Sequence, residues 1–335
     1  MHNTKGCNYI LSDTNTPPDF IDSIKQSTNA DWTVLEKLTP NKMPKWRRKL
    51  ITYIFTFRFM LCHRDAEYVL AWQQMFGILP AFLNRYIFHR KKLRINIMTF
   101  IYKPKHGLVG RIYHWLFKSA VSSRYVKSIF VFSETEVAHY SKIFPEAKDK
   151  FHFVTLGIPM DRTDYNDDAL SQEKYYFSTG FSNRDYDFLI KVFDNIPQKL
   201  KIACPNLKQE VPDNIEILQH CFGLDMKKQM FNSHAVLIPL KDLNVSSGQL
   251  VFITAMQMGK PIIITDSNPT YSYLTQDNAF IIKNDINSWR KAIETLDTDR
   301  ICYATMCRAN RLCAEKSFSS KSLGYKIGSI ITTDN

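Results

Sequence analysis

The stretch NVSSGQLVFITAMQMGKPIIITD, residues 244–266, decides the fold. It opens as a polar turn, continues as a helical pattern that stops at Gly259, and ends in a run typical of a buried strand. The helix starts at small residues, Ser246, Ser247 and Gly248, and the backbone amides of such a start can hold an anion. Before its last residue the stretch has no Asp or Glu. We therefore expect an anion site that works without a carboxylate.

Short apolar runs alternate with helical patterns along the whole chain. Strands are predicted near residues 8–11, 32–35, 68–71, 94–98, 129–132, 151–155, 175–178, 200–203, 215–218, 235–238, 261–264 and 279–282. Helical patterns separate them, among them 45–62, 75–88, 108–120 and 134–143, and helices from residue 286 end the chain. Such alternation is typical of βαβ units. The predicted fold class is α/β, with two Rossmann-like, doubly wound parallel-sheet domains facing a central cleft.

The chain of 335 residues is long enough for two domains. A polar, acidic stretch at residues 160–174 is the predicted linker. We expect a first domain over residues 1–165 and a second over 172–316. Residues 317–335 are predicted to form a C-terminal helix that packs back toward the first domain.

The composition points to a cytosolic globular protein. Hydrophobic residues make up 44% of the chain and charged residues 23%, so each domain can build its own core. The seven cysteines include no CxxC pair, which argues against a disulfide framework or a zinc site. The N-terminus lacks the basic and apolar blocks of a signal peptide. The most apolar run, residues 50–61, is interrupted by Arg58 and is too short to span a bilayer.

The net charge of +12 is concentrated in the first half of the chain. Residues 1–170 contain 25 Lys and Arg against 15 Asp and Glu, while the remainder contains 19 against 17. This asymmetry indicates an anionic partner, namely nucleic acid, membrane phosphates or a phosphorylated substrate. The alternative is a basic face that only increases solubility. No nucleic-acid motif accompanies the charge, so no nucleic-acid partner is expected.

Loops that follow the predicted strands of the second half carry the residues of a phosphate site. They are TGFSNRD (179–185), CPN (204–206), HCFG (220–223), PLKDLNVSSGQ (239–249) and DSNPTY (266–271). In doubly wound sheets ligands bind beyond the carboxyl ends of the strands. Glycine, serine and asparagine with Arg184 and Lys241 suit a diphosphate, which is held by backbone amides and a few cations. Each loop taken alone is more often just a turn, and it is the convergence of several such loops that indicates a phosphate site.

Three segments of the chain, two of which include residues of these loops, resemble motifs of a known family. SSGQLVFITAMQMGKPIIITD (246–266), YYFSTGFSNRDYDFLI (175–190) and IFVFSETEVAHYSKIFPEAKDKFHFVTLGIP (129–159) look like motifs of GT-B fold glycosyltransferases. The chain is most similar to the family-4 (group 1) enzymes of bacterial surface-polysaccharide synthesis. The resemblance covers roughly residues 125–320 and is weak in the first hundred.

The resemblance implies a second domain that binds a nucleotide-diphosphate sugar, of UDP or GDP type, as substrate, with no other cofactor. The implied donor-binding residues are Gly180, Ser182, Asn183, Arg184, Phe222, Ser246, Ser247, Gly248, Gln249 and Thr254. Two departures from the family pattern stand out. Phe181 replaces a common arginine, and the family's two glutamates fall on Ser246 and Thr254.

Catalysis by this set does not require the missing glutamates. Arg184, Lys241 and the helix start can stabilise the charge that develops on a leaving diphosphate. A base is needed only for direct inversion, and the resemblance implies a retaining, metal-independent hexosyltransferase. Asp185 and Asp187 have the spacing of a metal motif, but they stand at a helix start, where acids cap the helix. We expect no metal there.

The first half is the predicted acceptor domain. In the loop TFIYKPKHGLVG (99–110), Lys103, Lys105 and His106 can meet an acceptor phosphate, and His106 is the candidate base. A lone histidine is more often structural or simply exposed.

The segment KWRRKLITYIFTFRFMLCHR, residues 45–64, is a basic amphipathic helix. One stripe contains Trp46, Leu50, Tyr53, Ile54, Phe57, Met60 and Leu61. Such a helix suits an anionic membrane surface, and the basic segment 84–94 adds to the attraction. The alternative is an ordinary helix packed on the sheet.

The expected protein is a cytoplasmic transferase on the inner face of the cell membrane. It would move a sugar to a lipid-linked glycan in capsule, exopolysaccharide or O-antigen synthesis, with possible partner glycosyltransferases. The alternative is a non-catalytic homologue that serves as a membrane or partner-transferase interaction subunit.

Overall fold

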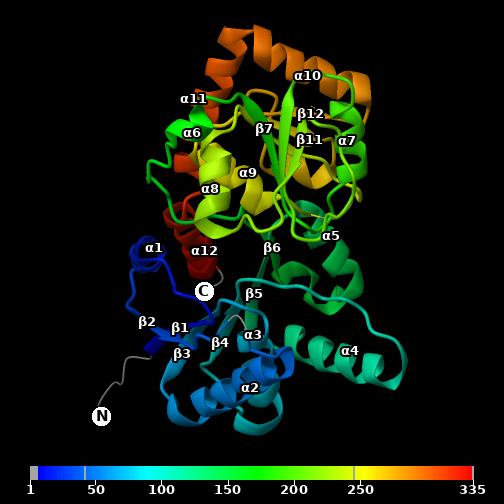
Figure 1. Cartoon of the computed structure of the whole chain (residues 1–335). Coiled ribbons are helices and arrows are strands. Elements are labelled where there is room, and N and C mark those ends of the chain that lie inside the picture. Colours follow the sequence, from blue (N-terminus) through cyan, green and yellow to red (C-terminus); the bar gives the residue numbers. More distant parts are fainter. Residues whose placement is uncertain (1–6, 41–42, 244–245, 334–335) are drawn as a thin grey trace. The chain divides into compact units, whose positions relative to one another are not determined.

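The computed structural model describes residues 7–40, 43–243 and 246–333. The chain forms two compact units, Met1–Val154 with Ser320–Asn335, and Thr155–Ser319 (Figure 1). Each unit has one six-stranded parallel sheet with helices on its faces. The predicted fold class is confirmed, and every predicted strand is present within a few residues of its expected bounds.

The sheet of the N-terminal unit has the order β2-β1-β3-β4-β5-β6. Its strands are β1 (Cys7–Ser12), β2 (Trp32–Glu36), β3 (Ala66–Ala71), β4 (Arg94–Ile97), β5 (Val126–Val131) and β6 (Phe151–Phe153). Its helices are α1 (Pro18–Thr28), α2 (Lys45–Cys62), α3 (Met75–Leu83), the π-helical turn η1 (Asn84–Phe88), α4 (Gly107–Val121), α5 (Glu134–Ile143), the 3-10 turn η2 (Pro145–Lys150) and α12 (Ser320–Thr333). The central strands are apolar on both sides because helices cover both faces.

The C-terminal unit has the strand order β12-β11-β10-β7-β8-β9. Its strands are β7 (Tyr175–Thr179), β8 (Lys199–Ala203), β9 (Ile215–Ile217), β10 (Ala235–Ile238), β11 (Ile262–Thr265) and β12 (Phe280–Ile282). Its helices are α6 (Asp168–Ser171), α7 (Tyr186–Phe193), α8 (Gly223–Asn232), α9 (Gln249–Gln257), the 3-10 turn η3 (Asn268–Ser272), α10 (Ile286–Thr298) and α11 (Arg300–Ser317). The quoted stretch that opened the sequence analysis therefore forms α9 and β11, and its residues 244–245 lie outside the described part.

The C-terminal helix α12 belongs to the N-terminal unit, as the sequence predicted, and it packs against α1. Two glycines make the approach close. A Cβ added at Gly324 would lie 2.0 Å from Ser23 Oγ, and one at Gly328 would lie 1.8 Å from Ser27 Oγ. Larger residues at either glycine would force the two helices apart.

Residues 160–174, predicted as a linker, lie inside the C-terminal unit, whose first residue is Thr155. Tyr165 is buried and donates a hydrogen bond to Asp161 (2.8 Å). Burial raises the pKa of Asp161, but hydrogen bonds from Lys227, Tyr165 and Thr163 outweigh it and hold the pKa well below its usual range. One of the acidic residues that suggested a solvated linker, Asp161, thus anchors the segment to α8 through Lys227.

Candidate functional site

Two loops meet at the carboxyl edge of the C-terminal sheet. One runs from Thr179, the end of β7, to α7, and the other from Ile238, the end of β10, to α9. Because β7 and β10 are hydrogen-bonded neighbours, their loops leave the sheet side by side. Positive φ values at Gly180 (114°) and Gly248 (93°) turn the two loops sharply.

Asn183 joins the two loops. Its side-chain nitrogen donates to the Asp242 carbonyl (2.9 Å) and to the Ser247 hydroxyl (2.9 Å). Its side-chain oxygen accepts from the Asp242 amide (2.7 Å). Asn183 itself has a φ of 53°, a left-handed conformation that asparagine adopts more readily than most residues. The side chain therefore fixes the loop after β10 against the loop after β7.

Arg184 is a buried cation between these loops, with only 8% of its surface exposed. Its guanidinium donates to the carbonyls of Thr179 (3.1 Å), Ser182 (3.1 Å) and Asn183 (3.4 Å). Within the described residues no carboxylate forms an ion pair with it, and burial lowers the pKa of Arg184. A buried cation without a counterion is costly, so the site favours an anion.

Glycines of both loops face this guanidinium. A Cβ added at Gly180 would lie 3.0 Å from Arg184 Nη2, and one at Gly248 would lie 3.7 Å from the same atom. Because these two residues have no side chain, the backbone of both loops lies close to the buried guanidinium. Arg184 thus places a positive charge directly beneath the backbone of the two loops.

We expect Gly180→Ala to lower the free energy of unfolding by about 1–3 kcal/mol, because a left-handed φ is strained for alanine and the methyl group crowds Arg184. The control is Gly223→Ala, which also has a positive φ (56°) but one that alanine adopts at a lower cost than 114°, and which has an open surrounding. Urea unfolding followed by circular dichroism measures both. An equal loss in the two variants would contradict a closely held Arg184.

The other predicted donor residues divide into two groups. Gln249 at the start of α9 donates to the Ser246 hydroxyl, so this pair lies beside the Ser247 and Gly248 turn. Lys241, exposed in the same loop, pairs with Asp187 (3.6 Å). Two residues are not brought into contact with this cluster. Thr254 donates within α9 to the Leu250 carbonyl (2.7 Å), and Phe222 stands at the head of α8, after β9, two strands away from β7.

Asp185 has the capping role that its position predicted. Its carboxylate accepts a hydrogen bond from the Phe188 amide (3.2 Å) at the start of α7. Phe181, which stands where the resembling family has arginine, is 73% exposed. An exposed aromatic ring in this loop offers a stacking surface in place of a charge.

Thr265 and Asn284 support the loop after β10, and the sequence analysis did not identify them. The Leu240 amide donates to Thr265 Oγ1 (2.7 Å), and Asn284 donates to the Leu240 carbonyl (3.0 Å). The two side chains also bond each other (2.6 Å). Thr265 directly follows the apolar run 262–264, and Asn284 comes two residues after Ile282, so polar residues at the ends of predicted strands could have identified them.

The N-terminal unit has a basic pocket of about 640 Å3 at the start of α4. Lys105, His106, Arg111 and His114 line it together with Tyr102, whose hydroxyl hydrogen-bonds His114 Nδ1 (2.9 Å). Lys105 Nζ lies 4.2 Å from the centre of the Tyr113 ring. Lys103 is exposed but does not line the pocket. Arg111 and His114 were missed, although they follow Gly107 by four and seven residues, the spacing of one helical face.

Helix α2 turns its predicted apolar stripe to solvent. Six of the seven stripe residues are 42–63% exposed, namely Trp46, Leu50, Tyr53, Ile54, Phe57 and Leu61. Met60 is the exception and is buried, together with Thr52, Thr56 and Phe59. The helix is packed on the core through Phe59 and Met60, as in the alternative of an ordinary helix, but the stripe itself, apart from Met60, is not the side that is buried.

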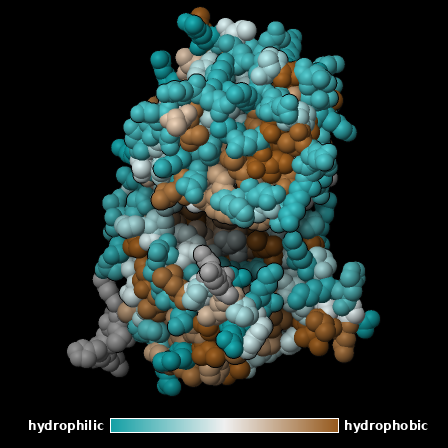
Figure 2. Space-filling view, in the orientation of Figure 1, coloured by the Kyte–Doolittle hydropathy of each residue, from teal (hydrophilic) through white to brown (hydrophobic). Residues whose placement is uncertain are grey.

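Further exposed apolar residues extend this surface, which we call the apolar face. They are Tyr86 and Ile87 of η1, and Leu108, Val109, Ile112 and Trp115 of α4. Ring contacts connect the three helices, between Phe57 and Phe88 (6.4 Å) and between Tyr86 and Trp115 (6.0 Å). Figure 2 shows hydrophobic residues at the surface over α2 and α4. Among the described residues, none of the helices has the length and apolar content needed to cross a membrane.

Comparisons with known proteins identify the fold. No protein-family model matches the chain, and no curated protein matches it in sequence. Solved structures do match over nearly the full length. Anabaena HepE in complex with UDP-glucose has a TM-score of 0.64 at 13% identity and covers 97% of this chain and 99% of its own. A Thermosynechococcus elongatus sucrose-phosphate synthase has a TM-score of 0.69 at 12% identity, with 98% of both chains covered.

A third similar structure is a glycosyltransferase from Rickettsia africae, with a TM-score of 0.59, 12% identity and 98% coverage of both chains. At these identities the likeness establishes the fold alone. The chain has the GT-B fold, with a Rossmann-like sheet in each unit.

Proposed function

We propose that this GT-B chain is a glycosyltransferase whose C-terminal unit binds a nucleotide-diphosphate sugar. The observation that carries the proposal is Arg184, a buried guanidinium without a carboxylate partner in the described chain, held between two glycine-turned loops. A diphosphate supplies the missing negative charge. Solved structures of the same fold contain UDP or UDP-glucose, which supports a ligand of this class.

In the proposed reaction the bond between the sugar C1 and the diphosphate oxygen breaks, and an acceptor hydroxyl forms the new bond to C1. Arg184 and Lys241, with the amides at the start of α9, stabilise the charge on the departing diphosphate. In a retaining mechanism the leaving phosphate takes the hydroxyl proton, so no carboxylate at Ser246 is required. The loop that contains Phe222 is proposed to contact the base of the nucleotide, and Thr254 is proposed to lie near its ribose. We propose that neither a metal nor a further cofactor takes part.

The acceptor is proposed to be a lipid-linked glycan with a phosphate group. The basic pocket at the start of α4 supports this, because its lining has two cations, two histidines and no carboxylate. We assign His106, the candidate base of the sequence analysis, the role of orienting the acceptor hydroxyl, whose proton passes to the leaving phosphate. The apolar face with its basic neighbours supports a cytoplasmic enzyme bound to the inner face of the membrane, in surface-polysaccharide synthesis.

Two steps test the function. Thermal shift is measured against UDP, GDP, CMP and their sugars, and nucleotide release is then followed with lipid-linked saccharides as acceptors. We expect stabilisation by one nucleotide class and release that depends on the acceptor. If no nucleotide shifts the melting temperature, the donor site is refuted. Binding without turnover on any acceptor would favour the non-catalytic alternative, in which the chain serves a membrane or a partner glycosyltransferase.

The basic pocket has its own test. We expect Arg111→Gln to raise the acceptor KM about tenfold and leave the thermal shift with nucleotide sugar unchanged, because a lost contact to phosphate removes at least 1.4 kcal/mol of binding. Lys103→Gln is the control, since Lys103 is exposed outside the pocket. An equal rise in both variants would indicate general electrostatic attraction instead of a bound acceptor.

A further inference from the structure

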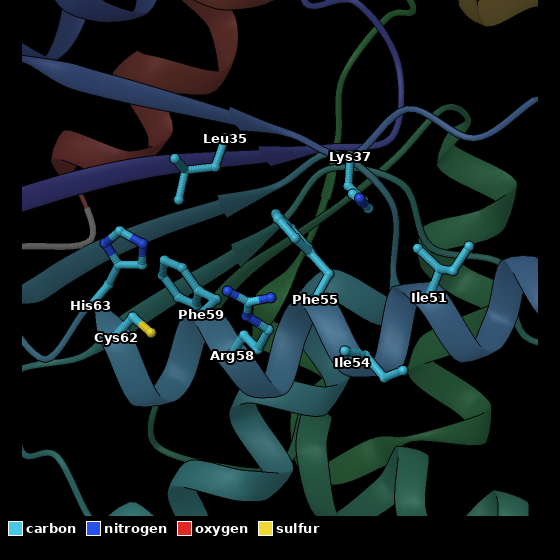
Figure 3. Close-up of a pocket in the computed structure, with 9 residues that line it drawn as sticks. All are labelled: Leu35, Lys37, Ile51, Ile54, Phe55, Arg58, Phe59, Cys62 and His63. Carbon is cyan, nitrogen blue, oxygen red and sulfur yellow. The ribbon is translucent and has the colours of Figure 1, made fainter.

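A groove lies between the edge strand β2 and helix α2 of the N-terminal unit, with a volume of about 500 Å3 (Figure 3). Its walls are apolar, formed by Leu35 from β2 and by Ile51, Ile54, Phe55 and Phe59 from α2. The groove exists because β2 ends the sheet and because α2, whose buried residues include Thr52, Thr56 and Met60, packs on α3. The side of α2 toward β2 is left incompletely covered.

Three basic side chains stand among these apolar walls. Lys37 extends from the end of β2, and Arg58 and His63 come from α2 and its C-terminal end. No Asp or Glu lines the groove. Among the described residues Lys37 and Arg58 form no ion pair, and the neighbouring acids are engaged elsewhere, Glu36 with the Thr16 amide and Asp65 with the Tyr9 hydroxyl. The groove thus combines an apolar trough with unpaired positive charge.

The groove is continuous with the apolar face through Ile54. This residue lines the groove and is 51% exposed on the same side of α2 as Leu50 and Phe57. A molecule lying in a bilayer against the apolar face therefore reaches the groove past Ile54. Such continuity fits an amphiphile better than a polar metabolite, which would find few hydrogen-bond partners on these walls.

We propose that the groove binds one anionic phospholipid. Its acyl chain lies along Leu35, Phe55 and Phe59, and its phosphate is bound by Arg58 and Lys37. The volume falls within the roughly 300–1,000 Å3 of small-molecule sites, and the charges match a single phosphate. The inference goes beyond sugar transfer, since the site needs neither nucleotide nor acceptor. Membrane attachment would then depend on one phospholipid bound per protein chain, in addition to insertion of the apolar face into the membrane surface.

Cys62 provides a direct readout, because its exposed thiol lines the groove. The full chain is treated with N-ethylmaleimide, and modification of each cysteine is followed by peptide mass spectrometry. The probe is dihexanoyl phosphatidylglycerol below its micelle-forming concentration, so that no membrane surface is present. We expect modification of Cys62 to slow about tenfold. Cys7, exposed but outside the groove, should keep its rate and serves as the internal control.

Matched lipids and variants separate specific binding from other causes. Dihexanoyl phosphatidylcholine should protect Cys62 much less, and Arg58→Gln should weaken the protection by phosphatidylglycerol about tenfold. Lys49→Gln, on the same helix but outside the groove, should leave it unchanged. Arg58 and Lys49 are both exposed, so these variants are expected to fold. Leu35→Trp, which fills the groove, should abolish protection.

Several results would overturn the proposal. Equal protection by the two lipids, an unchanged effect in Arg58→Gln, or slowing at Cys7 as well would show non-specific association. Protection by anionic vesicles without any by the monomeric lipid would assign the effect to the apolar face alone. That last result would leave the proposed membrane attachment standing, and none of these results bears on nucleotide binding.

Discussion

Arg184→Ala is expected to abolish the thermal shift given by a nucleotide-diphosphate sugar. The buried guanidinium has no carboxylate partner within the described residues, and its loss removes the cation beneath both loops. Removing one member of a buried charged pair costs about 2–5 kcal/mol, so affinity should fall at least about 30-fold. Isothermal titration with the nucleotide identified by thermal shift measures the loss. Arg184→Lys should retain part of the affinity, because it keeps the charge but not the planar fork.

The control for this variant must account for stability, since Arg184 also binds three backbone carbonyls. Arg290 has a comparable structural role in the same unit, donating to the carbonyls of Val192 (2.9 Å) and Asp194 (2.6 Å). Arg290→Ala should lower the melting temperature without changing nucleotide affinity. If Arg184→Ala behaves in the same way, with a lower melting temperature and full affinity, Arg184 only holds the loop and the diphosphate lies elsewhere.

Replacing Trp46, Leu50 and Phe57 together by serine is expected to release the protein from anionic vesicles. Inserting a large apolar side chain contributes about 1.5–3 kcal/mol, so the loss of three should weaken vesicle binding by more than 100-fold. The melting temperature should hardly change, because these side chains are 45–63% exposed in the folded chain. Co-sedimentation with vesicles of phosphatidylcholine and phosphatidylglycerol measures the effect.

Ile301→Ser with Leu312→Ser is the control for loss of exposed apolar side chains elsewhere, since both residues are exposed on α11 of the other unit. This pair should sediment with vesicles as the unmodified protein does. Lys91→Ala with Lys92→Ala should weaken binding by about 1 kcal/mol per residue, mainly at low salt, and leave the nucleotide-induced shift intact. Full vesicle binding by the triple serine variant would exclude the apolar face as the inserting surface.

The central strands could be predicted from sequence because they are largely buried on both faces. Runs such as the one that becomes β10 or β11 are apolar throughout and bounded by polar turns, so one pattern marks them. The bounds of α2 were also predicted correctly, since the structure has the helix over Lys45–Cys62. The position of the linker could not be predicted in this way. Acidic residues look solvated in a sequence, whereas Asp161 is held by Lys227 of α8, 66 residues later in the chain.

The sequence by itself determined the two α/β sheets, the loops at their carboxyl edges and a cation among those loops. Only the tertiary structure decided that Arg184 is buried beneath Gly180 and Gly248, because that depends on two loops meeting across neighbouring strands. It also decided which side of α2 is covered. Thr52 and Thr56 can be buried since their hydroxyls bond carbonyls of their own helix, at 3.0 and 2.7 Å. The apolar stripe, apart from Met60, is therefore left exposed, an outcome that hydrophobic periodicity alone does not predict.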